Sequence, residues 1–583
     1  MQEYDVCHVY ISCSHSDSPF PHGHNRFVSK VGSGYRQHRG GKYVFSCEFG
    51  WSKQDYLRAR INPIEVSSAR IMNCLHVILL LERAKVLGRI RAGLVSSVWV
   101  FLLFVPLFGV VLNVPAVEAN GTMYIHGDGS ITPAGAPVST VDNVTYTLTD
   151  NIVDAAPSDN ATAIVIERNN TVLNGAGYTL QGAYASYSKG IELSGRSNVT
   201  VKNITIKQFY YGVCLSVSFG NIVSGNNITA NNEFGVELSS SSSNTVSGNN
   251  VTYSNYAGIH LYNSSNNIVS GNNITNNYRG VYFLSSHGNT VSGNNVTYND
   301  YAGVTFSYSS FNIVSGNSIT NSYHGVDLWQ SSGNIVSGNN IVNNTGVSNS
   351  GYGIYIASSS GNSFYHNNFV NNTKQAYDYG LDDPHIPPST NVWDNEYPSG
   401  GNYWNDYVGV DANCDGICDI PYNIDVYSED NYPSMGMSYD FEVVRWGNEK
   451  YHVQVVSNST VSELYLAVWL SSPNQYLQPG QEFLQLFVEG ENHTRGFCRI
   501  TIPRALLNGT YTVLVDWTEV PAHELTASNT TYAYLYFAYN HTKHEIIIIP
   551  EFPLFLIQQL FMITTLLAVI VYKRKHTSKV KGI

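Results

Sequence analysis

A repeat of 22 or 23 residues is the feature of this sequence that most limits how the chain can fold. Between Asn198 and Asn362 the motif Ser-Gly-Asn-Asn-(Ile/Val)-Thr recurs, followed by a variable polar stretch and by Gly-(Val/Ile). The register is marked by Asn198, Asn221, Asn244, Asn267, Asn289, Asn312, Asn334 and Asn362. A unit this short cannot bury its own apolar face, so it has to stack on its neighbours.

Each repeat contains three short runs in which apolar and polar residues alternate. In the copy that starts at Asn267 these runs are Ile268–Ser270, Asn273–Thr275 and Gly280–Phe283. A period of two is typical of strands, and the repeats nowhere show the 3.6-residue spacing of a helix. Three strands per turn, with like residues in register, predict an all-β fold: a right-handed parallel β-helix with three short strands per coil, since parallel crossovers are overwhelmingly right-handed.

Stacked coils should place like residues above one another. We expect three inward columns of Val and Ile, which run from Val223 to Val336, from Ile228 to Ile319 and from Val236 to Ile354. A recurring asparagine at the bends should be structural, because its amide can hydrogen-bond to the coils above and below. These asparagines are Asn226, Asn249, Asn272, Asn294, Asn317 and Asn339.

The composition narrows the classes of partner. Only 13% of the residues are charged and the net charge is −12, which argues against binding to nucleic acid and gives no basic groove for phosphates. Ser, Thr, Asn, Gly and Tyr supply the polar surface instead, and many Asn-x-Ser/Thr sequons agree with export from the cell.

The region before the repeats contains an export signal. An apolar run from Leu94 to Val111 follows several basic residues and precedes the small-residue pattern Val117-Glu118-Ala119. We interpret 86–119 as a signal peptide, and 1–85 as a spurious or disordered extension that reflects a misplaced start codon. The alternative is an uncleaved transmembrane segment that follows a small cytoplasmic domain.

The C-terminal end has the pattern of a membrane anchor. Residues from Pro553 to Tyr572 are mostly apolar and a basic tail follows them, so 550–583 are predicted to be a transmembrane anchor with a cytoplasmic tail. This predicts a single-pass protein of the cell membrane, attached through its C-terminal helix, with 120–551 outside the cell. Alternating apolar runs between the repeats and the anchor predict an Ig-like β-sandwich over 436–549.

Two segments that flank the repeats carry a family resemblance. Ile164–Gly175 resembles the first coil of NosD-like and pectate-lyase-like β-helices. Gly400–Tyr407 and Asp411–Tyr422 closely resemble the C-terminal cap of the NosD-like family of exported β-helix proteins. With caps, the predicted β-helix covers 120–435. Pro550–Pro553 resembles the sorting signals of archaeal surface proteins.

The NosD resemblance also implies copper handling. Copper sites use clustered Met, Cys or His, whereas the chain has only 6 Met and its repeat histidines are dispersed over His260, His287, His324 and His366. Copper therefore stays an alternative function to which no residues are assigned.

The cap contains a run of ligands with calcium-loop spacing. Asp411, Asn413, Asp415 and Asp419, with the carbonyl of Ile417, occupy positions 1, 3, 5, 9 and 7, and Gly416 takes the turn at position 6. Position 12 is Tyr422 in place of a bidentate Glu. A weak extracellular calcium site and an Asx-turn cap without metal both fit this pattern. Cys414 and Cys418 are close enough in sequence to bridge across the same loop.

Candidate catalytic residues stand in one outward column of the repeats. Glu237 and His260 are on neighbouring coils and could form a proton-transfer pair, with Asp327 as a further carboxylate. Glu237 and Asp327 are four coils apart, about 19 Å at about 4.8 Å per coil, whereas glycosidase carboxylates need roughly 5 to 9.5 Å. A lyase would need an acidic cluster beside a basic residue, and Arg279 has none. The alternative for this column is a solvated strand face.

Tyrosines offer the larger functional signal. Aromatic rings among Ser, Asn and Thr suit a sugar chain, because CH faces stack on rings and hydroxyls meet amides. The alternative is that Tyr is simply a good β-surface residue. The rings of the repeats are Tyr253, Tyr256, Tyr262, Tyr278, Tyr282, Tyr298, Tyr301, Tyr308, Tyr323 and Tyr355. Of these, we predict that Tyr253, Tyr262, Tyr282, Tyr298 and Tyr355 contact the glycan.

Taken together, these patterns favour a cell-surface β-helix protein that binds extracellular or cell-envelope carbohydrate, in an adhesive or structural role and without catalysis. The first alternative is a polysaccharide lyase or glycoside hydrolase acting on extracellular carbohydrate, and the second is NosD-like copper handling.

Overall fold

The computed structural model describes residues 33–38, 42–47, 117–118, 121–346, 350–551 and 562–572. The chain divides into two units, 1–114 and 115–583. In the first, β1 (Ser33–His38) pairs antiparallel with β2 (Lys42–Cys47). The rest of 1–85 and the predicted signal peptide up to residue 116 lie outside the described residues. Val117 and Glu118, the start of the predicted cleavage pattern, form β3, which pairs in parallel with β8 (Ile152–Ala155).

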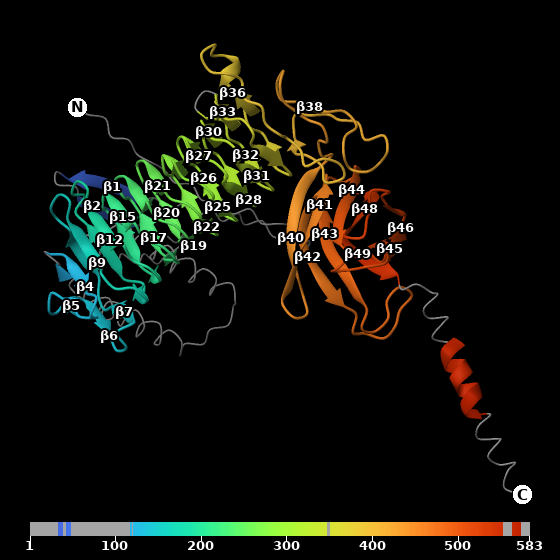
Figure 1. Cartoon of the computed structure of the whole chain (residues 1–583), viewed down its shortest axis with the longest axis horizontal. Coiled ribbons are helices and arrows are strands. Elements are labelled where there is room, and N and C mark those ends of the chain that lie inside the picture. Colours follow the sequence, from blue (N-terminus) through green and yellow to red (C-terminus); the bar gives the residue numbers. More distant parts are fainter. Residues whose placement is uncertain are drawn as a thin grey trace, which may run out of the picture. The chain divides into compact units, whose positions relative to one another are not determined.

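Three parallel sheets wind around one axis in the second unit, and their strands follow one another in the order of the sequence pattern (Figure 1). The first sheet consists of β6 (Val138–Thr140), β7 (Thr145–Leu148), β10 (Thr171–Asn174), β13 (Val199–Lys202), β16 (Ile222–Ser224), β19 (Thr245–Ser247), β22 (Ile268–Ser270), β25 (Thr290–Ser292), β28 (Ile313–Ser315), β31 (Ile335–Ser337) and β34 (Ser363–Tyr365).

The second sheet consists of β3 (Val117–Glu118), β8, β11 (Thr179–Gly182), β14 (Thr205–Lys207), β17 (Asn227–Thr229), β20 (Asn250–Thr252), β23 (Asn273–Thr275), β26 (Asn295–Thr297), β29 (Ser318–Thr320), β32 (Asn340–Val342), β35 (Asn368–Val370) and β37 (Tyr403–Trp404). The third sheet consists of β4 (Met123–Ile125), β5 (Ile131–Thr132), β9 (Thr162–Ile166), β12 (Lys189–Ser194), β15 (Tyr211–Ser216), β18 (Phe234–Ser239), β21 (Ala257–Tyr262), β24 (Arg279–Leu284), β27 (Ala302–Ser307), β30 (His324–Trp329), β33 (Tyr352–Ala357) and β36 (Lys374–Asp378). The prediction of a parallel β-helix is confirmed.

The core of the β-helix is the set of inward columns. Val223, Ile228 and Val236 have no exposed surface, and the residues stacked on them in later coils are equally buried. The repeated glycine lies where a strand of the third sheet approaches the next coil. A Cβ at Gly280 would lie 2.4 Å from the carbonyl oxygen of Gly303, which no side chain tolerates. The glycine of each repeat is therefore a packing requirement.

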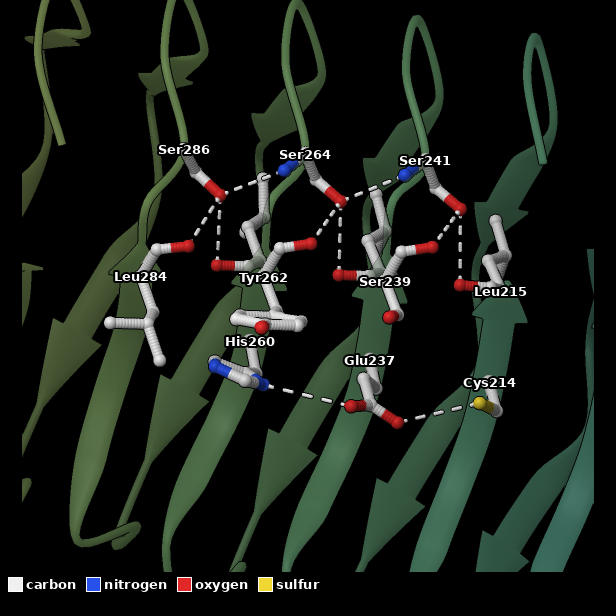
Figure 2. Close-up of polar contacts among 12 residues, drawn as sticks. Cys214, Leu215, Glu237, Ser239, Ser241, His260, Tyr262, Ser264, Leu284 and Ser286 are labelled. Carbon is white, nitrogen blue, oxygen red and sulfur yellow. Dashed lines mark hydrogen bonds and ion pairs between the residues drawn. The ribbon is translucent and has the colours of Figure 1, made fainter. Parts of the chain in front are cut away.

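Ladders of buried polar side chains run along the bends. The side chain of Asn294 donates to the carbonyl of Val269 and to Asn317, while its own Oδ1 accepts from the backbone and the side chain of Asn272. A parallel ladder of Ser241, Ser264 and Ser286 is visible in Figure 2, where the hydroxyls of Ser264 and Ser286 accept from the backbone N–H groups of Ser241 and Ser264. These bonds satisfy backbone groups that the bends leave unpaired, so the structural interpretation of the asparagines is confirmed.

One asparagine of the expected register lies outside the ladder. The side chain of Asn221 accepts from the N–H of Val199, and the pairing of Thr200 with Ile222 places Asn198 opposite Gly220. Asn198 has a φ of 54° and Gly220 a φ of 64°, so this position requires a left-handed turn. Asn serves there because it tolerates positive φ.

Aromatic residues close the C-terminal end of the helix core. Trp393 stacks on Phe364 at 4.3 Å between ring centroids, and Trp404 stacks on Phe369 at 4.4 Å. The buried carboxylate of Asp430 accepts from Trp404 Nε1 at 2.9 Å. The short elements of this cap are η2 (Tyr379–Leu381), β38 (Tyr422–Asn423) and β39 (Glu429–Asp430).

Two five-stranded antiparallel sheets follow the cap and share one buried core. One contains β40 (Met437–Arg445), β41 (Glu449–Ser457), β44 (Arg495–Pro503), β48 (Tyr532–Asn540) and β47 (Ala522–Glu524). The other contains β42 (Thr460–Val468), β43 (Glu482–Glu489), β49 (Lys543–Glu551), β45 (Thr510–Val515) and β46 (Thr518–Val520). Arg499 of this β-sandwich is 1% exposed and donates to the carbonyl of Pro398 in the cap.

The prediction of a C-terminal transmembrane helix is corrected by the structure. Of the predicted span, 562–572 form a helix, and 553–561 lie outside the described residues. In the part of the chain that the structure describes, no helix combines the length and the apolar character that a bilayer crossing requires. The described part of this helix is shorter than the roughly 20 residues, at about 1.5 Å each, that a bilayer crossing needs.

Candidate functional site

The outward face of the third sheet brings the predicted catalytic column together in register. Cys214, Glu237 and His260 stand on consecutive coils, and Tyr282, Thr305, Asp327 and Tyr355 follow them. The expectation of a solvated strand face is wrong for most of this column, since His260 is 6% exposed and Asp327 is 4% exposed. Large aromatic side chains from the same and neighbouring coils pack over the shorter residues of the column.

Glu237 and His260 lie side by side without forming a hydrogen bond (Figure 2). His260 Nδ1 is 3.9 Å from Glu237 Oε1, whereas the Cys214 thiol donates to Glu237 Oε2 at 3.4 Å. The imidazole is stacked between the rings of Phe234, at 4.2 Å, and Tyr282, at 5.1 Å, and both ring nitrogens are buried without a hydrogen-bond partner. A general base needs its nitrogen within reach of the proton it removes, so this histidine is arranged for packing.

Burial sets the charge of these groups. It lowers the pKa of His260 to about 3, with a smaller contribution from the charge of Arg279, and it raises the pKa of Glu237 above its usual value. Burial also raises the pKa of the Cys214 thiol, which stays protonated and donates to the carboxylate. Neither an imidazolium acid nor a thiolate nucleophile is therefore available here near neutral pH.

Asp327 is isolated from Glu237. The register places them four coils apart, which is about 19 Å at about 4.8 Å per coil. Burial raises the pKa of Asp327 to about 6, against the smaller opposing effects of a hydrogen bond with Tyr301 and the charge of Arg279. The two carboxylates cannot act on one glycosidic bond, because such a pair needs a separation of roughly 5 to 9.5 Å.

A continuous row of stacked tyrosines stands at the edge of the same face, and we call it the tyrosine ladder: Tyr256, Tyr278, Tyr301 and Tyr323. Each ring comes directly before a strand of the third sheet, namely β21, β24, β27 and β30. The centroids are separated by 6.3, 5.5 and 6.4 Å along the ladder, and the last two pairs are stacked within 25° of parallel. Tyr278 is 37% exposed, so the ladder presents ring surface to solvent.

Arg279 lies inside the ladder. Its guanidinium carbon is 4.8 Å from the ring centroid of Tyr278 and 4.6 Å from that of Tyr301, and the rings of Tyr256 and Tyr282 are 5.0 and 4.9 Å away. Contacts of this kind attract a cation to the ring faces. Its Nε and Nη1 are buried and find no hydrogen-bond partner in the part of the chain that the structure describes.

The five tyrosines selected from the sequence do not form one surface. Tyr253 and Tyr298, 60% and 59% exposed, lie in turns after β20 and β26, and each has positive φ. Tyr262 is exposed on β21, Tyr355 is half-buried and Tyr282 is 8% exposed, inside the packed layer. The ladder tyrosines are among the ring residues of the repeats but not among these five, although their place two residues before the repeat glycine marks them as a stacked column.

The cap loop uses its carboxylates for backbone contacts. Asp411 accepts from the N–H groups of Asp415 and Gly416 at 3.0 and 2.9 Å, and Asp419 accepts from that of Ala412 at 2.7 Å. The Asp415 carboxylate accepts from the N–H of Ile417, and Asn413 donates to Asp415 at 3.3 Å. This is the geometry of Asx turns. In the described residues, no group of three or more His, Cys, Asp or Glu side chains is placed to hold a metal ion.

The cysteines of the loop do not bridge. Cys414 is exposed and Cys418 is buried, and both are free thiols. The disulfide that their spacing would allow is therefore not formed in this structure. The sulfur of Cys418 lies 3.0 Å from that of Met435. Burial raises the pKa of the Cys418 thiol to about 12.

The fold is a parallel β-helix, and the sequence of its coils is similar to the NosD family. A family model described as "Periplasmic copper-binding protein (NosD)" matches residues 124–291 and 254–409, which together make up just under half of the chain. No curated protein matches the sequence.

Several solved structures resemble the fold at low similarity. The Dettilon tailspike protein (gp208) shares 13% identity and a TM-score of 0.31, over 69% of this chain and 86% of that one. The A-module of mannuronan C-5 epimerase AlgE4 from Azotobacter vinelandii shares 16% identity and a TM-score of 0.33, over 44% and 87%. DFA-IIIase from Arthrobacter chlorophenolicus A6 in complex with GF2 shares 15% and 0.31, over 42% and 66%. Likeness at this level carries no argument about function.

The residues of the coils do not fit the copper that the family description mentions. His260 and His324 lie three coils apart, about 14 Å at about 4.8 Å per coil, and each is stacked among aromatic rings. Copper sites bring soft or imidazole ligands together, and among the described residues no group of three or more His, Cys, Asp or Glu side chains is placed to hold a metal ion.

Proposed function

We propose that this protein is a surface or envelope β-helix protein that binds glycan without cleaving it, in an adhesive or structural role. The tyrosine ladder is the observation that carries the proposal. It offers stacked, partly exposed rings at a regular spacing on a rigid scaffold, and sugar CH faces pack well against such rings.

Polar groups beside the rings complete the proposed surface. Asn255 precedes Tyr256 and donates to Asn232 of the previous coil at 2.9 Å, and both amides are exposed. Asp300, also exposed, precedes Tyr301. Amide and carboxylate groups next to an aromatic platform can fix the orientation of sugar hydroxyls.

Location outside the cytoplasm is part of the same proposal. The periplasmic description of the matching family supports it. So do the sequons of the β-sandwich, because Asn458, Asn492, Asn508, Asn529 and Asn540 are all exposed and would be open to modification.

A glycan array paired with a sugar-release assay on the full chain tests the proposal. We expect binding without new reducing or unsaturated ends, and a loss of about three- to tenfold in affinity for Tyr278→Ala, as removal of an aromatic contact predicts. Tyr308→Ala is the matched control, since Tyr308 is 51% exposed and lies outside the ladder. Equal loss in both variants would contradict the ladder as the binding surface, and released sugar would favour the lyase or hydrolase alternative.

Calcium at Asp411, Asn413, Asp415, Ile417 and Asp419 stays a prediction. Binding would require these carboxylates to leave their backbone donors. A rise in melting temperature on adding calcium, absent in Asp411→Asn, would support it, since a ligand that binds only the folded state stabilises it.

A further inference from the structure

Within the described residues Arg279 is a cation that forms no ion pair, and it lies against the rings of the tyrosine ladder. It is the only Lys or Arg between Lys207 and Lys374. Its Nε and Nη1 are buried and have no hydrogen-bond partner within the described residues, and its surroundings are four neutral rings at 4.6 to 5.0 Å. Ring faces attract a guanidinium but leave its charge and its donors unmatched.

No acidic side chain forms an ion pair with Arg279 within the described residues. Asp327 is hydrogen-bonded to Tyr301, and the charge of Arg279 makes the smaller contribution to its pKa. Glu237 is two coils away from Arg279, and its carboxylate accepts a hydrogen bond from the Cys214 thiol. An unpaired, partly buried charge is costly. We therefore expect the anion that pairs with this half-buried arginine to come from a ligand.

The position of the charge suits a ligand on the ladder. The guanidinium carbon lies at nearly equal distances from the rings of Tyr278 and Tyr301, whose own centroids are 5.5 Å apart. A sugar ring that packs against these two tyrosines therefore brings its substituents next to the cation. Guanidinium groups bind carboxylates through charge-assisted hydrogen bonds.

We propose that the glycan bound by the tyrosine ladder is acidic, with a sugar carboxylate facing Arg279 while the sugar rings stack on Tyr278 and Tyr301. This inference rests on the proposed function and adds the chemical class of the ligand. Neutral polymers would bind the same rings more weakly, because they leave the guanidinium without a partner.

Titration calorimetry with the full chain tests it, using a polyuronate such as polygalacturonate and the same polymer after reduction of its carboxyl groups. We expect the wild type to prefer the acidic polymer and to lose affinity as salt is raised. Arg279→Gln should lower the affinity for the acidic polymer at least about tenfold and leave that for the reduced polymer unchanged. Arg279→Lys keeps the charge and should retain part of the preference.

Lys374→Gln is the matched control. Lys374 is exposed on β36 of the same sheet and also lies over a tyrosine, with its Nζ 4.7 Å from the ring of Tyr377. The Lys374→Gln substitution removes the same charge as Arg279→Gln. A general charge effect would therefore weaken binding equally in both glutamine variants and would overturn the inference.

The outcomes separate this inference from the proposed function. Equal binding of both polymers by the wild type, or an unchanged preference in folded Arg279→Gln, overturns the acidic ligand and leaves glycan binding standing. Absence of binding to either polymer and to the glycan array overturns both. If Arg279→Gln fails to fold, an Arg279→Lys variant that binds the reduced polymer as well as the acidic one overturns the acidic ligand.

Discussion

Individual side chains on the outward face of the third sheet are governed by burial. His260 is a neutral ring inside an aromatic stack, and Glu237 and Asp327 are carboxyl groups whose charged forms are disfavoured. The same residue types on an exposed strand would titrate normally and be open to solvent. Their chemistry is therefore decided by the tyrosines and phenylalanines that pack beside them.

Asp327 should make stability depend on pH with a definite sign. Its folded pKa of about 6 lies above the ordinary value of 3.8 for an aspartate, so the folded state holds a proton that the unfolded state releases between these values. The resulting stability is complete below pH 3.8 and is lost as the pH rises through 6. The loss amounts to about 3 kcal/mol, and it should be absent in Asp327→Asn.

Denaturant unfolding of the wild type and Asp327→Asn between pH 4 and 7 measures this effect. The difference between the two proteins is the relevant quantity, because His260 and His324 titrate in both and cancel. A difference that stays constant across this range would show that Asp327 keeps an ordinary pKa.

At the scale of the element, the polar ladders determine how one coil meets the next. The asparagines that cap the bends are buried, and each bonds to backbone and side chain in two neighbouring coils. Their spacing was readable in the sequence because every coil uses the same residue. The sequence did not reveal that Asn198 stands in a turn and not in the asparagine ladder, since this depends on the strand register of the first coils.

Asn294→Ala should destabilise the protein strongly. The substitution leaves the buried backbone N–H of Asn272 without its acceptor, at about 1–3 kcal/mol, and it also removes the side-chain donor to the carbonyl of Val269. Asn295→Ala is the neighbouring control, because Asn295 is exposed and its side chain bonds only to Asn273. Thermal unfolding of both variants gives the comparison, and similar melting temperatures would contradict a structural role for the ladder.

At the scale of the whole molecule, the β-helix is a linear stack whose repeats contact only their neighbours. The strand pairing follows this pattern through all three sheets. Removal of one complete coil should therefore preserve the fold, whereas removal of half a coil should place the polar side of each later strand toward the core.

Deletion of residues 312–333 removes one register step, from Asn312 to Asn334, and should leave a folded protein with a slightly lower melting temperature. Deletion of 312–322 should give loss of cooperative unfolding. Circular dichroism and thermal melts distinguish the two, and equal tolerance of both deletions would contradict register-dependent stacking.

The sequence determined the parallel β-helix, its three inward columns and its asparagine ladder, because the same residues recur at a fixed period and a period fixes what stacks. Only the tertiary structure decided which outward residues are buried. Neighbouring coils bring Phe234 and Tyr282 against His260 and set four rings around Arg279. Such contacts depend on how side chains of different coils lean across the sheet, and no spacing within one repeat contains that information.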